Sequence, residues 1–177
     1  SSAIIRDCAF TGNRADDNGG AVYILRGGPP VTSCRFENNE AGNGGAVYVR
    51  NAAADLRLCC FRDSSAGNAG GAVGLENGDT VVAGNVFLYN RAGQFGGALY
   101  GHGDWGTCRA LIAANTVVLN TAPSGGAVAS DSQVEIEFRN NIVHRNGSGV
   151  AVGGGAWTIH SNCVQGNAAY DWTGVEN

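Results

Sequence analysis

The sequence predicts an all-β solenoid: a single-stranded right-handed parallel β-helix of about seven coils, with three short strands in each coil. Three observations predict this fold. A short frame of residues recurs seven times, the apolar runs are short and broken by glycine, and no stretch has the 3.6-residue apolar period of a helix. A regular period of this length indicates stacked coils, and the usual crossover rule gives their hand.

The recurring frame is an aromatic residue or valine, an asparagine three residues later and an alanine two residues after that. Successive copies are separated by 26, 25, 26, 30, 26 and 21 residues. Stacked strands lie about 4.8 Å apart, so we expect Phe and Val to pile up inside, Ala where only a methyl fits, and Asn to bond from coil to coil. The seven coils are centred on Phe10, Phe36, Phe61, Phe87, Val117, Val143 and Val164.

Each coil is expected to contain three strands. The first follows a Gly-Gly pair and covers residues 21–24 in the first copy; the second leads into Cys/Asn-x-Phe; the third runs through Phe-x-x-Asn-x-Ala. Paired glycines suit a turn that needs positive φ or close backbone approach. The Gly-Gly-Ala-Val or Gly-Gly-Ala-Leu motifs begin at Gly19, Gly44, Gly70, Gly96 and Gly125.

These alternating motifs resemble pectate-lyase-like β-helix repeat proteins, and most of all the repeats of the polymorphic outer membrane protein family. The resemblance extends from Ile4 to Asn167. It implies a bacterial protein that is extracellular or on the cell surface. The shared residues are those of the core and the turns, and such coils carry many different functions.

Composition narrows the class further. The chain has 177 residues, 44% of them apolar, and 29 glycines, so we expect residues 1–177 to form a single β-helix domain. A net charge of −4 with no basic cluster excludes a nucleic-acid surface. No apolar run approaches the length of a membrane span. Because the chain begins without Met, we expect a fragment or processed piece of a longer protein.

The register favours thiols over any particular disulfide bridge among the six cysteines, and it leaves their redox state open. Cys8, Cys34 and Cys59 share an inward column, where thiols are common core fillers. Cys60 and Cys163 share an outward column but lie four coils apart, roughly 19 Å, which is too far for a bridge. Cys108 is expected in an insertion, without a partner in register. No metal site and no cofactor is predicted.

The candidate site is a strip on the strands that follow the paired glycines. Alternation should turn Val22 and Ile24 inward, and Ala21 and Tyr23 outward. Aromatic rings beside charged groups suit sugars, which stack on rings and hydrogen-bond at their edges. The other interpretation is that tyrosines stack between coils and charges only solvate the sheet. The strip comprises Tyr48, Arg50, Glu76, Tyr100, His102, Asp104, Trp105 and Asp131.

The favoured function is a non-catalytic extracellular or cell-surface β-helix used for adhesion, display or head-to-tail assembly into filaments, because no catalytic cluster stands out from the repeats. Its partner would be a polysaccharide or another surface protein. The alternative is a carbohydrate-active enzyme, either a polysaccharide lyase or a glycoside hydrolase. Glu76 and Asp131 would then be its acid pair, two coils or about 9–10 Å apart. A glycan-binding module using the same strip is the third interpretation.

Overall fold

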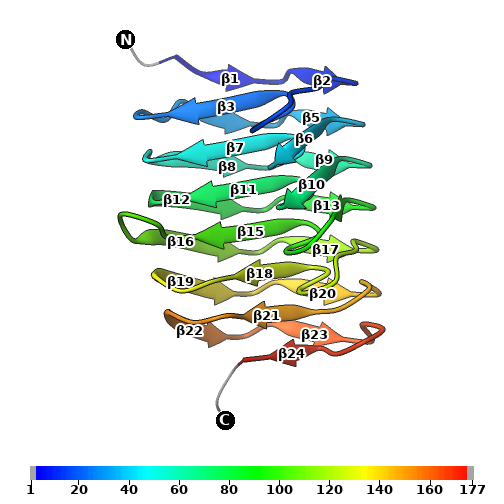
Figure 1. The fold of residues 1–177 in the computed structure, drawn as a ribbon. Coiled ribbons are helices and arrows are strands. Elements are labelled where there is room, and N and C mark those ends of the chain that lie inside the picture. The colour runs from blue at the N-terminus through cyan, green and yellow to red at the C-terminus, as the bar shows by residue number, and fades with distance from the viewer. Residues whose placement is uncertain (1–2, 175–177) are drawn as a thin grey trace.

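The structure, a computed structural model, describes residues 3–174 and confirms the all-β solenoid (Figure 1). The chain winds in coils that stack from the N-terminal to the C-terminal end, and each strand pairs in parallel with its equivalent in the next coil. Three seven-stranded sheets run along the rod. Within the described part of the chain, no helix is long and apolar enough to cross a membrane.

Each coil contributes a strand to sheets A, B and D in chain order, and coils two to four add a strand to a short sheet C. Sheet A consists of β1 (Ile5–Arg6), β4 (Pro30–Thr32), β8 (Ala54–Arg57), β12 (Gly78–Ala83), β16 (Cys108–Ala113), β19 (Val134–Arg139) and β22 (Ala156–His160). Sheet B consists of β2 (Ala9–Thr11), β5 (Arg35–Glu37), β9 (Cys60–Arg62), β13 (Val86–Leu88), β17 (Thr116–Val118), β20 (Ile142–His144) and β23 (Cys163–Gln165). Sheet C consists of β6 (Glu40–Asn43), β10 (Ser65–Ala69) and β14 (Arg91–Ala92). Sheet D consists of β3 (Val22–Leu25), β7 (Val47–Arg50), β11 (Val73–Glu76), β15 (Leu99–His102), β18 (Val128–Ser130), β21 (Val150–Val152) and β24 (Trp172–Thr173).

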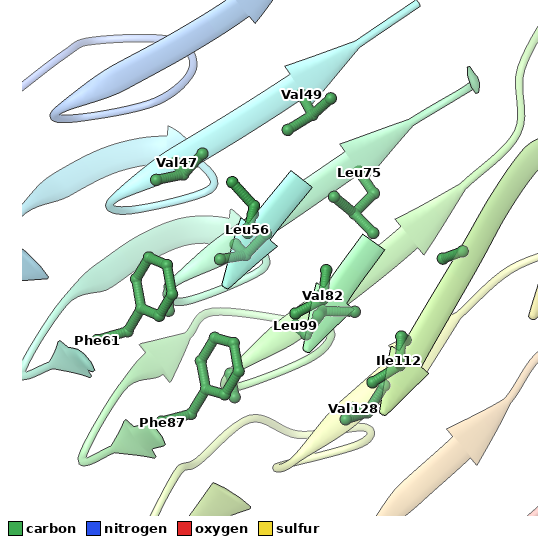
Figure 2. Packing of buried hydrophobic residues seen from close by; sticks show 14 of the residues in the cluster. Val47, Val49, Leu56, Phe61, Leu75, Val82, Phe87, Leu99, Ile112 and Val128 are labelled. Atoms are coloured by element: carbon green, nitrogen blue, oxygen red, sulfur yellow. The ribbon is translucent and has the colours of Figure 1, made fainter. Parts of the chain in front are cut away.

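The predicted register is confirmed in the core. The aromatic and valine column is continuous from Phe10 to Val164 through the pairings of sheet B. The rings of Phe10, Phe36, Phe61 and Phe87 stack at centroid distances of 4.8, 4.8 and 4.9 Å. Figure 2 shows Phe61 and Phe87 one above the other, beside inward side chains of the other sheets. One narrow apolar core therefore fills the rod.

The Asn columns form the predicted coil-to-coil hydrogen bonds. Asn90 Nδ2 donates to Asn120 Oδ1 at 2.9 Å, and Asn120 Nδ2 donates to Asn146 Oδ1 at 3.0 Å. The same asparagines accept from the backbone of the preceding coil; Asn90 N, for instance, donates to Asn120 Oδ1 at 2.9 Å. The amides therefore satisfy backbone groups that the corners of the coils would leave unpaired.

The two glycines of each pair have different roles, and both roles were predicted. Gly70 has φ +65°, a conformation that L side chains rarely adopt. At its neighbour Gly71, an added Cβ would lie 2.1 Å from the carbonyl oxygen of Gly97. The first glycine therefore turns the chain, and the second lets successive coils approach.

Three predictions of detail are wrong. The third strand does not run from Phe to Ala, because the residue before the Asn has positive φ and bends the chain; β5 and β6 are consequently separate strands. The alanine after the paired glycines does not face outward, since Ala46 and Ala72 are fully buried. Ala46 N and Val47 N both donate to Ala72 O, at 2.9 and 3.0 Å, and this bulge-like kink breaks the alternation. Cys108 lies in strand β16 and in the core, not in an insertion.

Candidate functional site

The predicted strip lies on the outward face of sheet D, and its register is as expected. Tyr48 pairs with Gly74, which pairs with Tyr100 in the following coil. Two residues further along the strands, Arg50 pairs with Glu76, which pairs with His102. Asp131 follows β18 directly, and its N–H donates to Gly101 O at 3.2 Å. Four successive coils therefore contribute to one surface.

Tyr48, Arg50 and Glu76 form the first cluster of this surface. Tyr48 Oη donates to Glu76 Oε2 at 2.7 Å, and Arg50 Nε lies 2.9 Å from Glu76 Oε1. Only 8% of Tyr48 and 7% of Glu76 is exposed. Burial, and then the hydrogen bond to Glu76, raises the pKa of Tyr48 above its ordinary value. Both carboxylate oxygens are thus engaged, and the phenol stays a donor.

Tyr100, His102 and Asp131 form a second cluster of the same design. Tyr100 Oη donates to Asp131 Oδ2 at 3.1 Å, and His102 Nδ1 contacts the same oxygen. Gly103 N donates to Asp131 Oδ1 at 3.4 Å. Burial, and then the negative charge of Asp131, raises the pKa of Tyr100. This cluster is more open than the first, because the His102 and Asp131 side chains are each 34% exposed.

A groove of about 330 Å³ connects the two clusters. It holds six of the eight predicted residues, and sequence reasoning missed the amides of its rim, which repeat from coil to coil just before the paired glycines. Asn68 Nδ2 donates to Asn43 Oδ1 at 2.9 Å along that rim. The lining residues are Asn43, Tyr48, Arg50, Asn68, Glu76, Tyr100, His102 and Asp104.

Asp131 and Trp105 lie outside this first groove. Asp131 lines a second groove of about 260 Å³ on the far side of Tyr100, together with Phe95 and the ends of β18, β21 and β24. The ring of Phe95, which the sequence interpretation also missed, lies 5.8 Å from that of Tyr100. Trp105 is 93% exposed, on the loop between β15 and β16 that projects from the rod (Figure 1). In that loop, Asp104 N donates to Asn77 Oδ1 at 3.1 Å.

A larger hollow of about 530 Å³ lies over sheet A, away from these residues. Two of its charged side chains pair with each other, since Arg109 Nε lies 2.8 Å from Glu135 Oε2. Its lining of aliphatic, threonine and charged residues contains no aromatic ring. The grooves on sheet D, with aromatic rings, amides and fixed carboxylates, are therefore the better candidate site.

Within residues 3–174, no group of three or more His, Cys, Asp or Glu side chains is placed to hold a metal ion. The structure joins none of the six cysteines, all in this range, in a disulfide. Cys34 and Cys59 are buried in the core, whereas Cys8 and Cys163 are exposed. Burial raises the pKa of Cys59 and of Cys108 to about 11, so both thiols stay neutral.

Comparison with known proteins identifies the family. The family model described as the right-handed β-helix region matches residues 1–167, and the chain belongs to this family. This match also supports the predicted hand of the coils. No curated protein and no solved structure matches the chain. The finer resemblance to polymorphic outer membrane protein repeats stays a prediction.

Proposed function

We propose that this protein is a non-catalytic β-helix of the bacterial cell surface or extracellular space, which serves in adhesion by binding a carbohydrate on the outward face of sheet D. The observation that carries the proposal is the state of its two carboxylates. Glu76 is held by Tyr48 and Arg50, and Asp131 by Tyr100 and His102. These contacts hold both carboxylates in place as hydrogen-bond acceptors.

Carbohydrate suits this surface for a second reason. Sugar hydroxyls need acceptors and donors at fixed places, and the carboxylates and the rim amides of Asn43 and Asn68 supply both. The exposed Trp105 offers a ring on which a sugar can stack, and Tyr100 lines both grooves. The location on the cell surface rests on the family resemblance.

A glycan array, followed by titration with tyrosine and tryptophan fluorescence as the readout, tests the proposal. We expect saturable binding that weakens when Tyr100 or Trp105 is replaced by Ala. Arg109→Ala on the sheet A face is the matched control, and it should bind as the unaltered protein does. Failure of every neutral and acidic glycan to bind would refute the proposal.

A carbohydrate-active enzyme is the second candidate function, because the distance between the two carboxylates suits an acid pair. Glu76 and Asp131 lie two coils apart, roughly 9–10 Å, near the upper end for an inverting hydrolase. Incubating the bound glycan with the protein and measuring new reducing ends or unsaturated products decides between the two. We expect no product; turnover that Glu76→Gln or Asp131→Asn abolishes would favour the enzyme.

A further inference from the structure

On the outward face of sheet D, the four successive strands β7, β11, β15 and β18 alternate with a period of two coils, superposed on the one-coil repeat of the fold. Tyr23 in the strand before them and Ala151 in the strand after them do not continue the alternation. Large and small residues alternate at one position, in the order Tyr48, Gly74, Tyr100, Ala129. Basic and acidic residues alternate two residues further on, in the order Arg50, Glu76, His102, Asp131. Each pair of coils thus builds one unit: a tyrosine and a base from the first coil, a small residue and an acid from the next.

The small residue explains how each unit forms. A Cβ at Gly74 would lie 2.6 Å from Cδ2 of Tyr48, so the Tyr48 ring lies across the following coil. From there its hydroxyl reaches Glu76. Tyr100 reaches Asp131 in the same sense past Ala129, which is 1% exposed. Both tyrosines therefore extend along the rod toward its C-terminal end, and the two units repeat by translation.

The translation from one unit to the next defines the distance between equivalent groups along the rod. Two coils correspond to about 9–10 Å along the rod. The grooves of about 330 and 260 Å³ lie on either side of Tyr100, which lines both of them. The face therefore presents two consecutive sites along the rod axis, each with a fixed carboxylate. They are separated by Tyr100, whose ring stacks with those of Phe95 and His102.

We propose that the ligand is a neutral, linear, β-1,4-linked polysaccharide that lies along the rod, one pair of sugars to each two-coil unit. This inference rests on the proposed function. In such an extended chain successive sugars alternate in orientation, so the same face recurs at every second sugar, roughly the step between the two units. Hydroxyls of equivalent sugars would then donate to Glu76 and to Asp131.

Charge favours a neutral chain over an acidic one. The two grooves contain the carboxylates of Glu76, Asp104 and Asp131, against the one permanently charged cation, Arg50. Arg50 is already paired with Glu76. A uronic acid polymer would add like charge to this surface, which is unfavourable.

Isothermal titration of the protein with neutral β-1,4-linked oligosaccharides of two to six sugars, at low and high salt, tests the inference. We expect affinity to rise at least tenfold from two to four sugars, to level off beyond that, and to change little with salt. Asp131→Asn should bring the affinity for four sugars down to that for two. Arg109→Ala should change neither value, and thermal melting checks that the variants fold.

Several outcomes would overturn the inference. Affinity that is equal for two, four and six sugars would remove the two-unit match, and tighter binding of oligouronates than of neutral chains would remove the charge argument. Either result leaves carbohydrate binding itself intact. Absence of binding to neutral and acidic oligosaccharides alike would instead remove the proposed function together with the inference.

Discussion

At the scale of single residues, the corners of the coils depend on side-chain amides. The residue before each ladder asparagine has positive φ, even where it is as large as Tyr89 (58°) or Leu119 (60°). Such residues rarely adopt this conformation. The turn is held because the following amide pairs with the neighbouring coils, as Asn90 does. The Asn columns were predictable from sequence; the strained residues before them were not, because no local preference favours them.

Asn90→Ala should therefore be costly. Asn90 is fully buried, accepts from Ser64 N at 3.0 Å and donates to Phe61 O at 3.0 Å. Its removal leaves these buried groups unpaired, and we expect a loss of about 2–3 kcal/mol in the free energy of unfolding, measured by urea denaturation. Asn68→Ala, in the exposed amide row, should lose less than about 1 kcal/mol. Comparable losses at the two positions would contradict the role of the buried ladder.

Cys59→Asn should stabilise the protein. Cys59 occupies a column that holds asparagine in the four later coils, and its sulfur lies 3.5 Å from Val31 O. In the next coil, Asn85 Nδ2 donates to the equivalent oxygen, that of Leu56, at 2.9 Å. The amide should add about 1 kcal/mol, or about 2–4 °C in Tm. Cys60→Ser, outside the column, should leave Tm nearly unchanged; a lower Tm for Cys59→Asn would show that the amide does not fit.

At the scale of elements, the sequence predicts columns better than strand ends. The centres of the three strands, the stacked Phe rings and the outward Tyr and charged columns all follow from period and alternation. The split between β5 and β6, and the buried Ala46, do not, because a bend or a bulge shifts the alternation by one residue. The burial of Tyr48 was equally out of reach, since it depends on the missing side chain of Gly74 in the next coil.

The Ala column of sheet C gives the element-scale prediction. Ala66 is buried and pairs with Ala41 and Ala92 in the neighbouring coils. Ala66→Leu must press on two coils at once, so we expect a loss of about 1–3 kcal/mol, measured by thermal and urea unfolding. Arg62→Ala, on the exposed face of β9, should cost within about 0.5 kcal/mol. Equal effects would place Ala66 on the surface and refute the register.

At the scale of the whole molecule, the two ends of the rod differ. Near the first coil, a hollow of about 440 Å³ opens between β1 and β3, lined largely by apolar residues such as Ile5 and Val22. At the other end, an aromatic side chain covers the core. Trp172 lies in β24, which pairs with β21, and its ring lies 5.9 Å from Phe138 at an interplanar angle of 88°.

Asp171 ends the Asn column that runs through Asn120, Asn146 and Asn167. In earlier coils, as at Asn120 and Asn146, the backbone N–H and the side-chain amide of the asparagine donate to the asparagine of the next coil. Asn167 N and Nδ2 instead both donate to Asp171 Oδ1, at 3.0 and 2.8 Å. An ionised carboxylate only accepts hydrogen bonds, so Asp171 accepts from Asn167 and has no donor for a further asparagine. Continuing the ladder onto a second molecule would require displacing Asp171. We therefore expect light scattering at neutral pH to show no head-to-tail growth with concentration.

The same contact should make this end sensitive to acid. The hydrogen bonds from Asn167, the backbone one first, lower the pKa of Asp171 below its ordinary value. A lowered pKa means that the unfolded state binds the proton more readily, so the stabilisation is complete above about pH 4 and is lost as pH falls through the folded-state pKa. Hydrogen exchange of the Asn167 amide should then accelerate, relative to its intrinsic rate, at acid pH. In Asp171→Ala this amide should exchange fast at neutral pH as well, while that of Asn120 stays protected. Equal protection of Asn167 in both proteins at neutral pH would show that Asp171 does not hold the end of the ladder.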